Sequence, residues 1–138
     1  MNRQLQIEIR IGPFSRGIHL VTEDILSQLG RLPSTGLLHL FIQHTSAGLT
    51  INENADLSVR HDMQGFIDEM VPEQWPGYTH TIEGPDDMPA HIKASLLGSS
   101  VSIPITNHML NMGVWQGIYL GEFRDKAGPR SILATIIC

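Results

Sequence analysis

Residues 37–52 read LLHLFIQHTSAGLTIN and contain two candidate β-strands joined by a polar turn. Residues 37–44 are strongly apolar, so we expect a strand that is buried on both faces, and residues 48–52 are expected to form a short strand after the turn. Residues 4–11 alternate polar and apolar side chains, which is typical of a strand with one buried face. Further strands are predicted over residues 100–105, 114–123 and 131–138.

Helical patterns separate these strands. Thr22 is expected to cap a short helix that stops at Gly30, and Asn54 or Asp56 is expected to cap a longer amphipathic helix. A third helix is predicted to begin near Pro89 and end at Gly98, with Asp86 or Asp87 as its cap. Strands with interspersed helices predict a single α+β domain over residues 1–138, a β-sandwich of mostly antiparallel strands with two or three flanking helices.

Composition restricts the classes of function. The net charge of −5 argues against nucleic acid as the main partner, because neutralising phosphates needs a basic surface. No apolar run approaches the roughly 20 residues of a membrane-spanning helix, and the N-terminus has no signal-peptide pattern, so we expect no membrane association. The single cysteine, Cys138, is consistent with a reducing compartment, and we expect a cytoplasmic protein.

The stretch from His44 to Asp62 concentrates two histidines, three carboxylates and several hydroxyls in nineteen residues. His44 ends the apolar strand, which would hold its imidazole rigidly at a pocket. The hydroxyls of Thr45 and Ser46 stand beside it, and we consider them substrate-binding candidates. Glu53 and Asp62 suit acid–base work, the holding of a divalent ion or the orientation of a histidine, although Asp62 could equally be a solvated helix side chain.

Two further histidines and one late strand extend the candidate site. His91 falls in the first turn of the third helix, where the helix dipole favours neutral imidazole, the form that binds a metal. His80 lies eleven residues upstream, a spacing that is no established metal signature. Gln116 and Glu122 share one face of the late strand and are pocket candidates, whereas the aromatic residues of the other face indicate core or a subunit interface.

Several blocks together resemble the YjbQ family. They are SRGIHLVTEDI, LLHLFIQHTSAGLTINENAD, VRHDM, DDMPAHIKASLLGSSVSIPI and GVWQGIYLGEFRD, and they cover nearly the whole chain in the family's order. The resemblance implies an α+β fold with a β-sandwich, assembled as a homotrimer with pockets near subunit boundaries. By motif it points to these site residues: His44, Glu53, Asn54, Asp62, His80, His91, Gln116 and Glu122. The loop that holds Asp86 and Asp87 differs among relatives, which leaves their role open.

The resemblance also implies an enzyme of the thiamine-phosphate synthase type, which joins a pyrimidine diphosphate to a thiazole phosphate. The resemblance then implies a small phosphorylated metabolite as the partner. It also implies three groups of site residues. Catalysis falls to His44, Glu53, Asp62, His91 and Gln116, substrate binding to Thr45, Ser46, Asn54 and Glu122, and metal binding to His44, His80 and His91. Few basic residues lie in these motifs, so a divalent metal, zinc or magnesium, is expected to balance the phosphate charge. The alternatives are a metal- or small-ligand-binding homo-oligomer with incidental activity, and a metal-assisted hydrolase.

Overall fold

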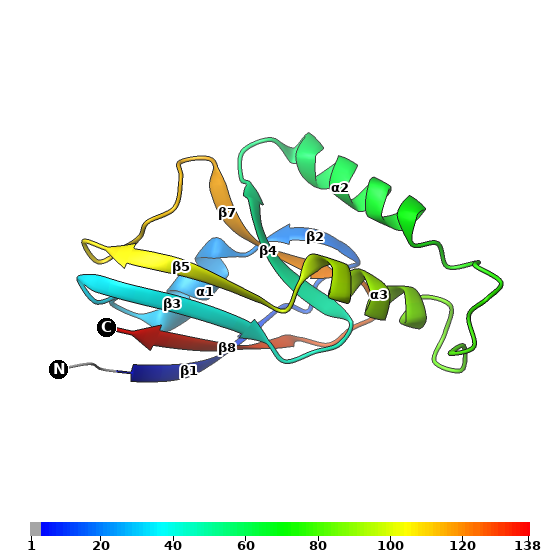
Figure 1. Ribbon diagram of the computed structural model, residues 1–138, viewed down its shortest axis with the longest axis horizontal. Helices are drawn as coiled ribbons and strands as arrows, with labels where there is room; N and C mark the ends of the chain where they lie inside the picture. The colour runs from blue at the N-terminus through cyan, green and yellow to red at the C-terminus, as the bar shows by residue number, and fades with distance from the viewer. Residues whose placement is uncertain (1–3) are drawn as a thin grey trace.

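The computed structural model describes residues 4–138 and consists of two antiparallel sheets and three helices (Figure 1). The larger sheet contains, in spatial order, β1 (Gln4–Ile11), β8 (Arg130–Ile137), β3 (Thr35–Ile42), β5 (Ser100–Thr106) and β6 (Met109–Leu110). The smaller sheet contains β2 (Gly17–Leu20), β7 (Gln116–Glu122) and β4 (Ala47–Glu53).

The main core lies between the two sheets. Alternate residues of β3 such as Leu38 and Leu40 face Leu49 of β4 and Leu120 of β7, and all four are at most 1% exposed. The helix α1 (Thr22–Leu29) closes this core with Ile25. The predicted α+β class, with mostly antiparallel sheets and flanking helices, is therefore confirmed.

A second, smaller core lies on the other face of the small sheet. There α2 (Leu57–Met70) and α3 (Asp87–Leu97) pack on the sheet (Figure 1), with Ala90 and Ala94 of α3 against Tyr119 of β7. The small sheet is thus the middle of three layers. Because it is covered on both faces, six of the seven residues of β7 are buried.

This layering corrects the prediction for the opening stretch of sequence. The strand β3 was expected to be buried on both faces, but Leu37 is 38% and Phe41 is 43% exposed, because none of the helices within residues 4–138 covers the outer face of the large sheet. The strand that is buried on both faces is β7, in the middle layer. Apolar content alone did not distinguish the two strands.

The helix boundaries agree broadly with the sequence patterns, and the caps agree in part. The side chain of Asp56 accepts a hydrogen bond from Ser58 N at the start of α2, as expected of a helix cap. Thr22 does not cap α1, because its hydroxyl accepts the hydrogen bond of Ile118 N instead. Asp86 lies at the cap position of α3, but its side chain makes no capping hydrogen bond.

Helix α3 ends in close contact with β4. A Cβ atom on Gly48 would lie 2.9 Å from the carbonyl oxygen of Gly98, so only glycine allows this contact. Leu49 N also donates to that carbonyl at 2.9 Å. Nearer the start of α3, His91 Nδ1 lies 2.9 Å from the carbonyl oxygen of Thr45, so this part of the helix lies beside the β3–β4 turn. None of the helices described over residues 4–138 has the length and apolar character needed to cross a membrane.

Candidate metal centre

Three ionisable side chains converge at the start of α3. His80 comes from the long connection between α2 and α3, whereas Asp87 and His91 lie four residues apart on α3 and therefore share one face of the helix. His80 Nε2 lies 2.6 Å and His91 Nε2 lies 3.0 Å from the same oxygen, Oδ2 of Asp87. The three candidate ligand atoms lie within 4.8 Å of one another.

Burial differs sharply within this cluster. The side chain of Asp87 is 2% exposed, whereas those of His80 and His91 are 45% and 30% exposed. Burial alone would raise the pKa of the Asp87 carboxyl, but the hydrogen bond from His80 and the nearby charges of His91 and Arg124 outweigh it and lower that pKa. The cluster is therefore a buried carboxylate under two solvent-accessible imidazoles.

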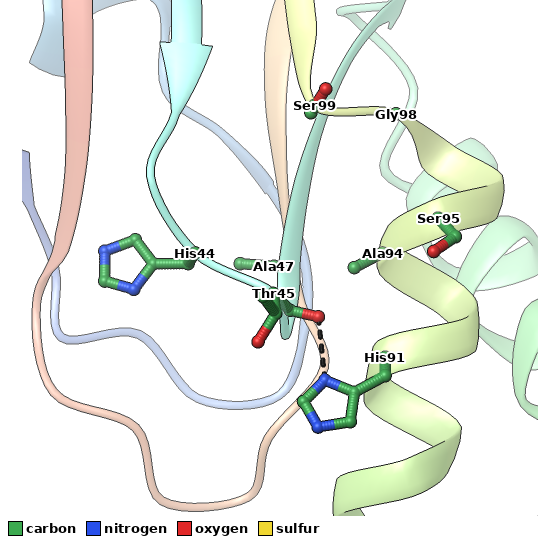
Figure 2. Close-up of a pocket in the computed structure, with 8 residues that line it drawn as sticks. All are labelled: His44, Thr45, Ala47, His91, Ala94, Ser95, Gly98 and Ser99. Carbon is green, nitrogen blue, oxygen red and sulfur yellow. Dashed lines mark hydrogen bonds between the residues drawn. The ribbon is translucent and has the colours of Figure 1, made fainter.

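The backbone determines which nitrogen of His91 carries its proton. His91 Nδ1 lies 2.9 Å from the carbonyl oxygen of Thr45 (Figure 2), and a carbonyl can only accept a hydrogen bond. The Nδ1 atom must therefore donate, so in neutral His91 the lone pair lies on Nε2, the atom that faces Asp87 Oδ2. Two acceptors then face each other, and a cation or a second proton is needed between them.

Arg124 supports the buried carboxylate from the other side. Its Nη1 donates to Asp87 Oδ1, its Nε donates to Asp86 Oδ2 at 2.8 Å, and its Nη2 donates to the Glu83 carbonyl at 3.1 Å. Asp125 N also donates to Asp86 Oδ2 at 3.0 Å. Burial disfavours the charged form of Asp86, but these hydrogen bonds outweigh it and lower the pKa of the carboxyl.

A cavity of about 720 Å³ opens beside His91, lined by His44, Thr45, Ala47, His91, Ala94, Ser95, Gly98 and Ser99 (Figure 2). These residues come from the β3–β4 turn, one face of α3 and the turn that follows it. They include three hydroxyl groups and no lysine or arginine. The lining therefore offers hydrogen-bonding groups on a largely apolar surface, and it brings no permanent positive charge.

His44 is not part of the convergent cluster, although it was predicted as a metal ligand. Its ring points away from His91 (Figure 2), and its Nε2 accepts a hydrogen bond from Ser131 N at 2.8 Å. Burial and the positive charge of Arg130 lower the pKa of His44, which favours the neutral ring. Its lone pair is thus used by the backbone of β8, and the structure supports a structural role at this position.

Ser46 and Glu122, predicted to bind substrate, form part of a buried ion pair. Both oxygens of Glu122 accept from Arg130, with Arg130 Nε at 2.7 Å from Oε1 and Nη2 at 2.5 Å from Oε2. Arg130 Nη2 also donates to Ser46 Oγ at 2.9 Å. Glu122 is fully buried and Ser46 is nearly so, and the ion pair accounts for both side chains, whereas their role in substrate binding stays a prediction.

The four remaining candidates lie away from the cluster, around the start of α2 and the turn before β7. Glu53 Oε2 accepts from the backbone of Asp56 at 2.9 Å, and Asn54 Nδ2 donates to the carbonyl of Gln116 at 3.0 Å. Gln116 Oε1 in turn accepts from Gly113 N at 2.8 Å. Asp62 is on the solvent side of α2 with its side chain 80% exposed. The structure therefore shows local hydrogen bonds or solvation at these positions and does not bring them to His80 and His91.

Two members of the site were missed by the sequence reasoning. Asp87 was considered only as a helix cap, although its spacing of four residues from His91 places the two on one helix face and was a usable signal. Arg124 was not considered, because 37 residues separate it from Asp87 and only the folded chain brings them together.

Comparison with known proteins shows which family the chain belongs to. A family model described as "UPF0047 protein YjbQ-like" matches residues 6–138. The chain belongs to the YjbQ family. A curated relative from Escherichia coli O157:H7, named UPF0047 protein YjbQ, is 53% identical over 124 residues, which is 88% of this chain and 89% of the relative. The Salmonella typhimurium protein of the same name is 49% identical and covers 95% of this chain and 96% of its own.

Solved structures agree with the fold. A Clostridium acetobutylicum protein of the YjbQ/UPF0047 family superposes with a TM-score of 0.77 at 36% identity, covering 96% of this chain and 98% of the other. A Sulfolobus solfataricus structure, described as a YbjQ-like protein of unknown function, has a TM-score of 0.85 at 20% identity over 99% of both chains. The second match supports the fold alone.

These findings overturn the predicted thiamine-phosphate synthase activity. The matching family and its curated members are named without any catalytic activity, so membership in the YjbQ family does not carry that reaction to this chain. The cluster at the start of α3 also has few basic groups to bind a diphosphate. Among residues 4–138, the only lysine or arginine hydrogen-bonded to the cluster is Arg124, and its guanidinium group is already paired with two carboxylates.

Proposed function

We propose that this chain binds one divalent transition-metal ion through His80 Nε2, Asp87 Oδ2 and His91 Nε2. The observation that carries the proposal is the hydrogen bond from His91 Nδ1 to the Thr45 carbonyl, which turns the lone pair of Nε2 toward the carboxylate. Metal-binding histidines typically donate their other N–H to a backbone carbonyl or carboxylate in this way. Three protein ligands leave a coordination position for water or a small ligand.

The ligand types favour zinc over magnesium. Imidazole nitrogen suits zinc, copper, iron and nickel, whereas magnesium prefers oxygen ligands in an octahedral arrangement. Two of the three ligand atoms here are imidazole nitrogens. The partial exposure of both rings leaves a path by which the ion can enter from solvent.

Metal analysis of the tag-free protein tests this proposal. The purified chain is stripped with a chelator, titrated with Zn²⁺ by calorimetry and compared with His80→Ala, Asp87→Ala and His91→Ala. We expect one ion per chain in the wild type and an affinity loss in each variant of more than the roughly 10–100-fold that is typical of an outer-shell partner.

His61→Ala is the matched control for these variants. His61 also lies beside a carboxylate, with Nδ1 at 3.2 Å from Asp62 Oδ1, but this pair is 88% and 80% exposed, and within the described residues it belongs to no group of three potential ligands. We expect His61→Ala to bind zinc as the wild type does. If the folded wild-type chain binds no zinc, or if all three cluster variants bind it unchanged, the proposal is wrong.

A small-molecule partner, the homotrimer and a cytoplasmic location remain predictions. The cavity beside His91 supports a small polar ligand, although its lining has no basic residue to favour a phosphorylated one. The uncovered outer face of the large sheet, with Leu37, Phe41 and Ile137 about two-fifths exposed, supports association with further copies. Light scattering at several concentrations tests the trimer, which predicts three times the mass of one chain.

A further inference from the structure

The carboxylate of Asp87 has its two oxygens in different surroundings. Oδ2 faces both histidine nitrogens, at 2.6 and 3.0 Å, and is the oxygen of the proposed metal site. Oδ1 accepts a hydrogen bond from Arg124 Nη1. Because the side chain is 2% exposed, water does not compete for either oxygen. The two oxygens therefore have separate partners, one on each side of the carboxylate.

Arg124 is itself held in place by several contacts. Its Nε is fixed by Asp86 Oδ2 at 2.8 Å and its Nη2 by the Glu83 carbonyl at 3.1 Å. Its backbone N–H donates to Glu122 Oε2 at 3.2 Å, directly after the buried strand β7. A guanidinium group presents its donors in a planar, rigid fork, so fixing Nε and Nη2 also fixes the direction of Nη1 toward Asp87.

We propose that Arg124 is a positioning residue that makes Asp87 a one-oxygen metal ligand by occupying its second carboxylate oxygen. The inference rests on the proposed metal site and adds to it the mode of coordination. A carboxylate can bind a metal through one oxygen or through both, and two-oxygen binding suits larger ions of high coordination number such as Ca²⁺. With Oδ1 occupied, the site offers two nitrogens and one oxygen, which fits a four-coordinate ion with one water.

Cobalt(II) reports this coordination mode directly, because four-coordinate Co²⁺ absorbs visible light far more strongly than five- or six-coordinate Co²⁺. The chelator-stripped protein and its Arg124→Gln variant are titrated with Co²⁺, and Zn²⁺ affinity is then measured by competition. We expect intense visible bands in the wild type, and weaker bands in Arg124→Gln, where Oδ1 is free to bind the ion. The Zn²⁺ affinity of the variant should fall about 10–100-fold.

Arg16→Gln is the matched control. Arg16 is 28% exposed, close to the 26% of Arg124, and likewise pairs with two carboxylates, Glu73 and Asp125, but it does not contact the cluster. We expect its Co²⁺ spectrum and Zn²⁺ affinity to match the wild type. A purely structural loss caused by removing a paired arginine would affect both variants alike, whereas the spectral change is specific to Arg124.

Asp86→Asn provides a second route if Arg124→Gln does not fold. It retains Arg124 but removes the charge that holds Nε, so we expect a weaker change in the same direction in both spectrum and affinity. A wild-type chain that binds neither ion overturns the metal site and this inference together. A wild type that binds both ions, with spectrum and affinity unchanged in the folded variants, overturns the role of Arg124 alone.

Discussion

Two arginine–carboxylate pairs meet at the end of β7 but are built in opposite ways. The Glu122–Arg130 pair is closed, with side chains 0% and 8% exposed and with Ser46 taking a remaining donor of Arg130. The Asp87–Arg124 pair is open on one side, because Asp87 Oδ2 faces two imidazoles that are 30–45% exposed. In the closed pair both carboxylate oxygens of Glu122 accept hydrogen bonds from Arg130. The open pair retains acceptors that converge on one point, and that property is what a cation needs.

The two pairs are connected through the same strand ends. Glu122 Oε2 accepts from the backbone of Arg124, and Ser46 directly follows Thr45, whose carbonyl orients His91. The closed pair therefore ties together the ends of β4 and β7 on which the open pair depends. We expect the closed pair to dominate folding stability and the open pair to dominate metal binding.

Breaking the closed pair should give the largest effect on stability. Glu122→Ala leaves the charge of Arg130 buried without its partner, and removing one member of a buried pair typically costs about 3–5 kcal/mol. Urea unfolding measures this as a lower transition midpoint. The double replacement Glu122→Leu with Arg130→Met should recover much of the loss, since no charge is then left unpaired. Equal destabilisation in the single and double variants would contradict this account.

Breaking the open pair should have a smaller effect on stability and a large one on metal binding. Asp87→Ala leaves Arg124 with Asp86 as a partner, and we expect a loss of about 1–3 kcal/mol in the absence of metal. Zinc at about 100 times the wild-type Kd should stabilise the wild type by about 2.7 kcal/mol and a variant with 100-fold weaker binding by only about 0.4 kcal/mol. Thermal unfolding with and without zinc measures both. A variant that zinc stabilises as much as the wild type would remove the distinction between the two pairs.

A third ion pair, between α2 and α3, has one buried and one partly exposed member, so it lies between the closed and the open pair in burial. Lys93 is 1% exposed and its Nζ lies 2.6 Å from Asp68 Oδ1, whereas Asp68 is 37% exposed. Asp68→Ala should cost about 1–3 kcal/mol, because it leaves a buried ammonium group with incomplete solvation. Lys93→Met removes that charge and should cost less. A larger loss of stability in Lys93→Met than in Asp68→Ala, measured by urea unfolding, would show that the buried charge does not determine the cost.

The smallest expected effect is a dependence of stability on pH at His44. Its pKa is lowered in the folded protein, so between the folded value and the unfolded value near 6.5 the unfolded chain binds more protons. Stability is therefore complete above about pH 6.5 and decreases as the pH falls below it. His44→Asn should reduce this slope in urea midpoints, whereas the exposed His61→Ala should retain it. An unchanged slope in His44→Asn would assign the effect to another group.

The sequence predicted the fold class and the helices well, because apolar periodicity and caps such as Asp56 are local signals. Strand parity predicted that Glu122 faces a pocket, because that argument assumes that one face of a strand is exposed. In the structure β7 lies in the middle layer, and six of its seven residues are buried. Within the cluster, His91 followed from its place at a helix start and His80 from the family resemblance. Arg124 could not be predicted, because its contacts with Asp86 and Asp87 depend on the packing of β7 against α3.

Zinc titration of the chelator-stripped, tag-free chain tests the central claim most directly. The account predicts one zinc ion per chain, with binding strongly weakened in Asp87→Ala and retained in His61→Ala, because Asp87 Oδ2 faces both His80 and His91 whereas His61 lies outside this cluster. A folded wild-type chain that takes up no zinc, or an Asp87→Ala variant that binds it with unchanged affinity, would contradict the account.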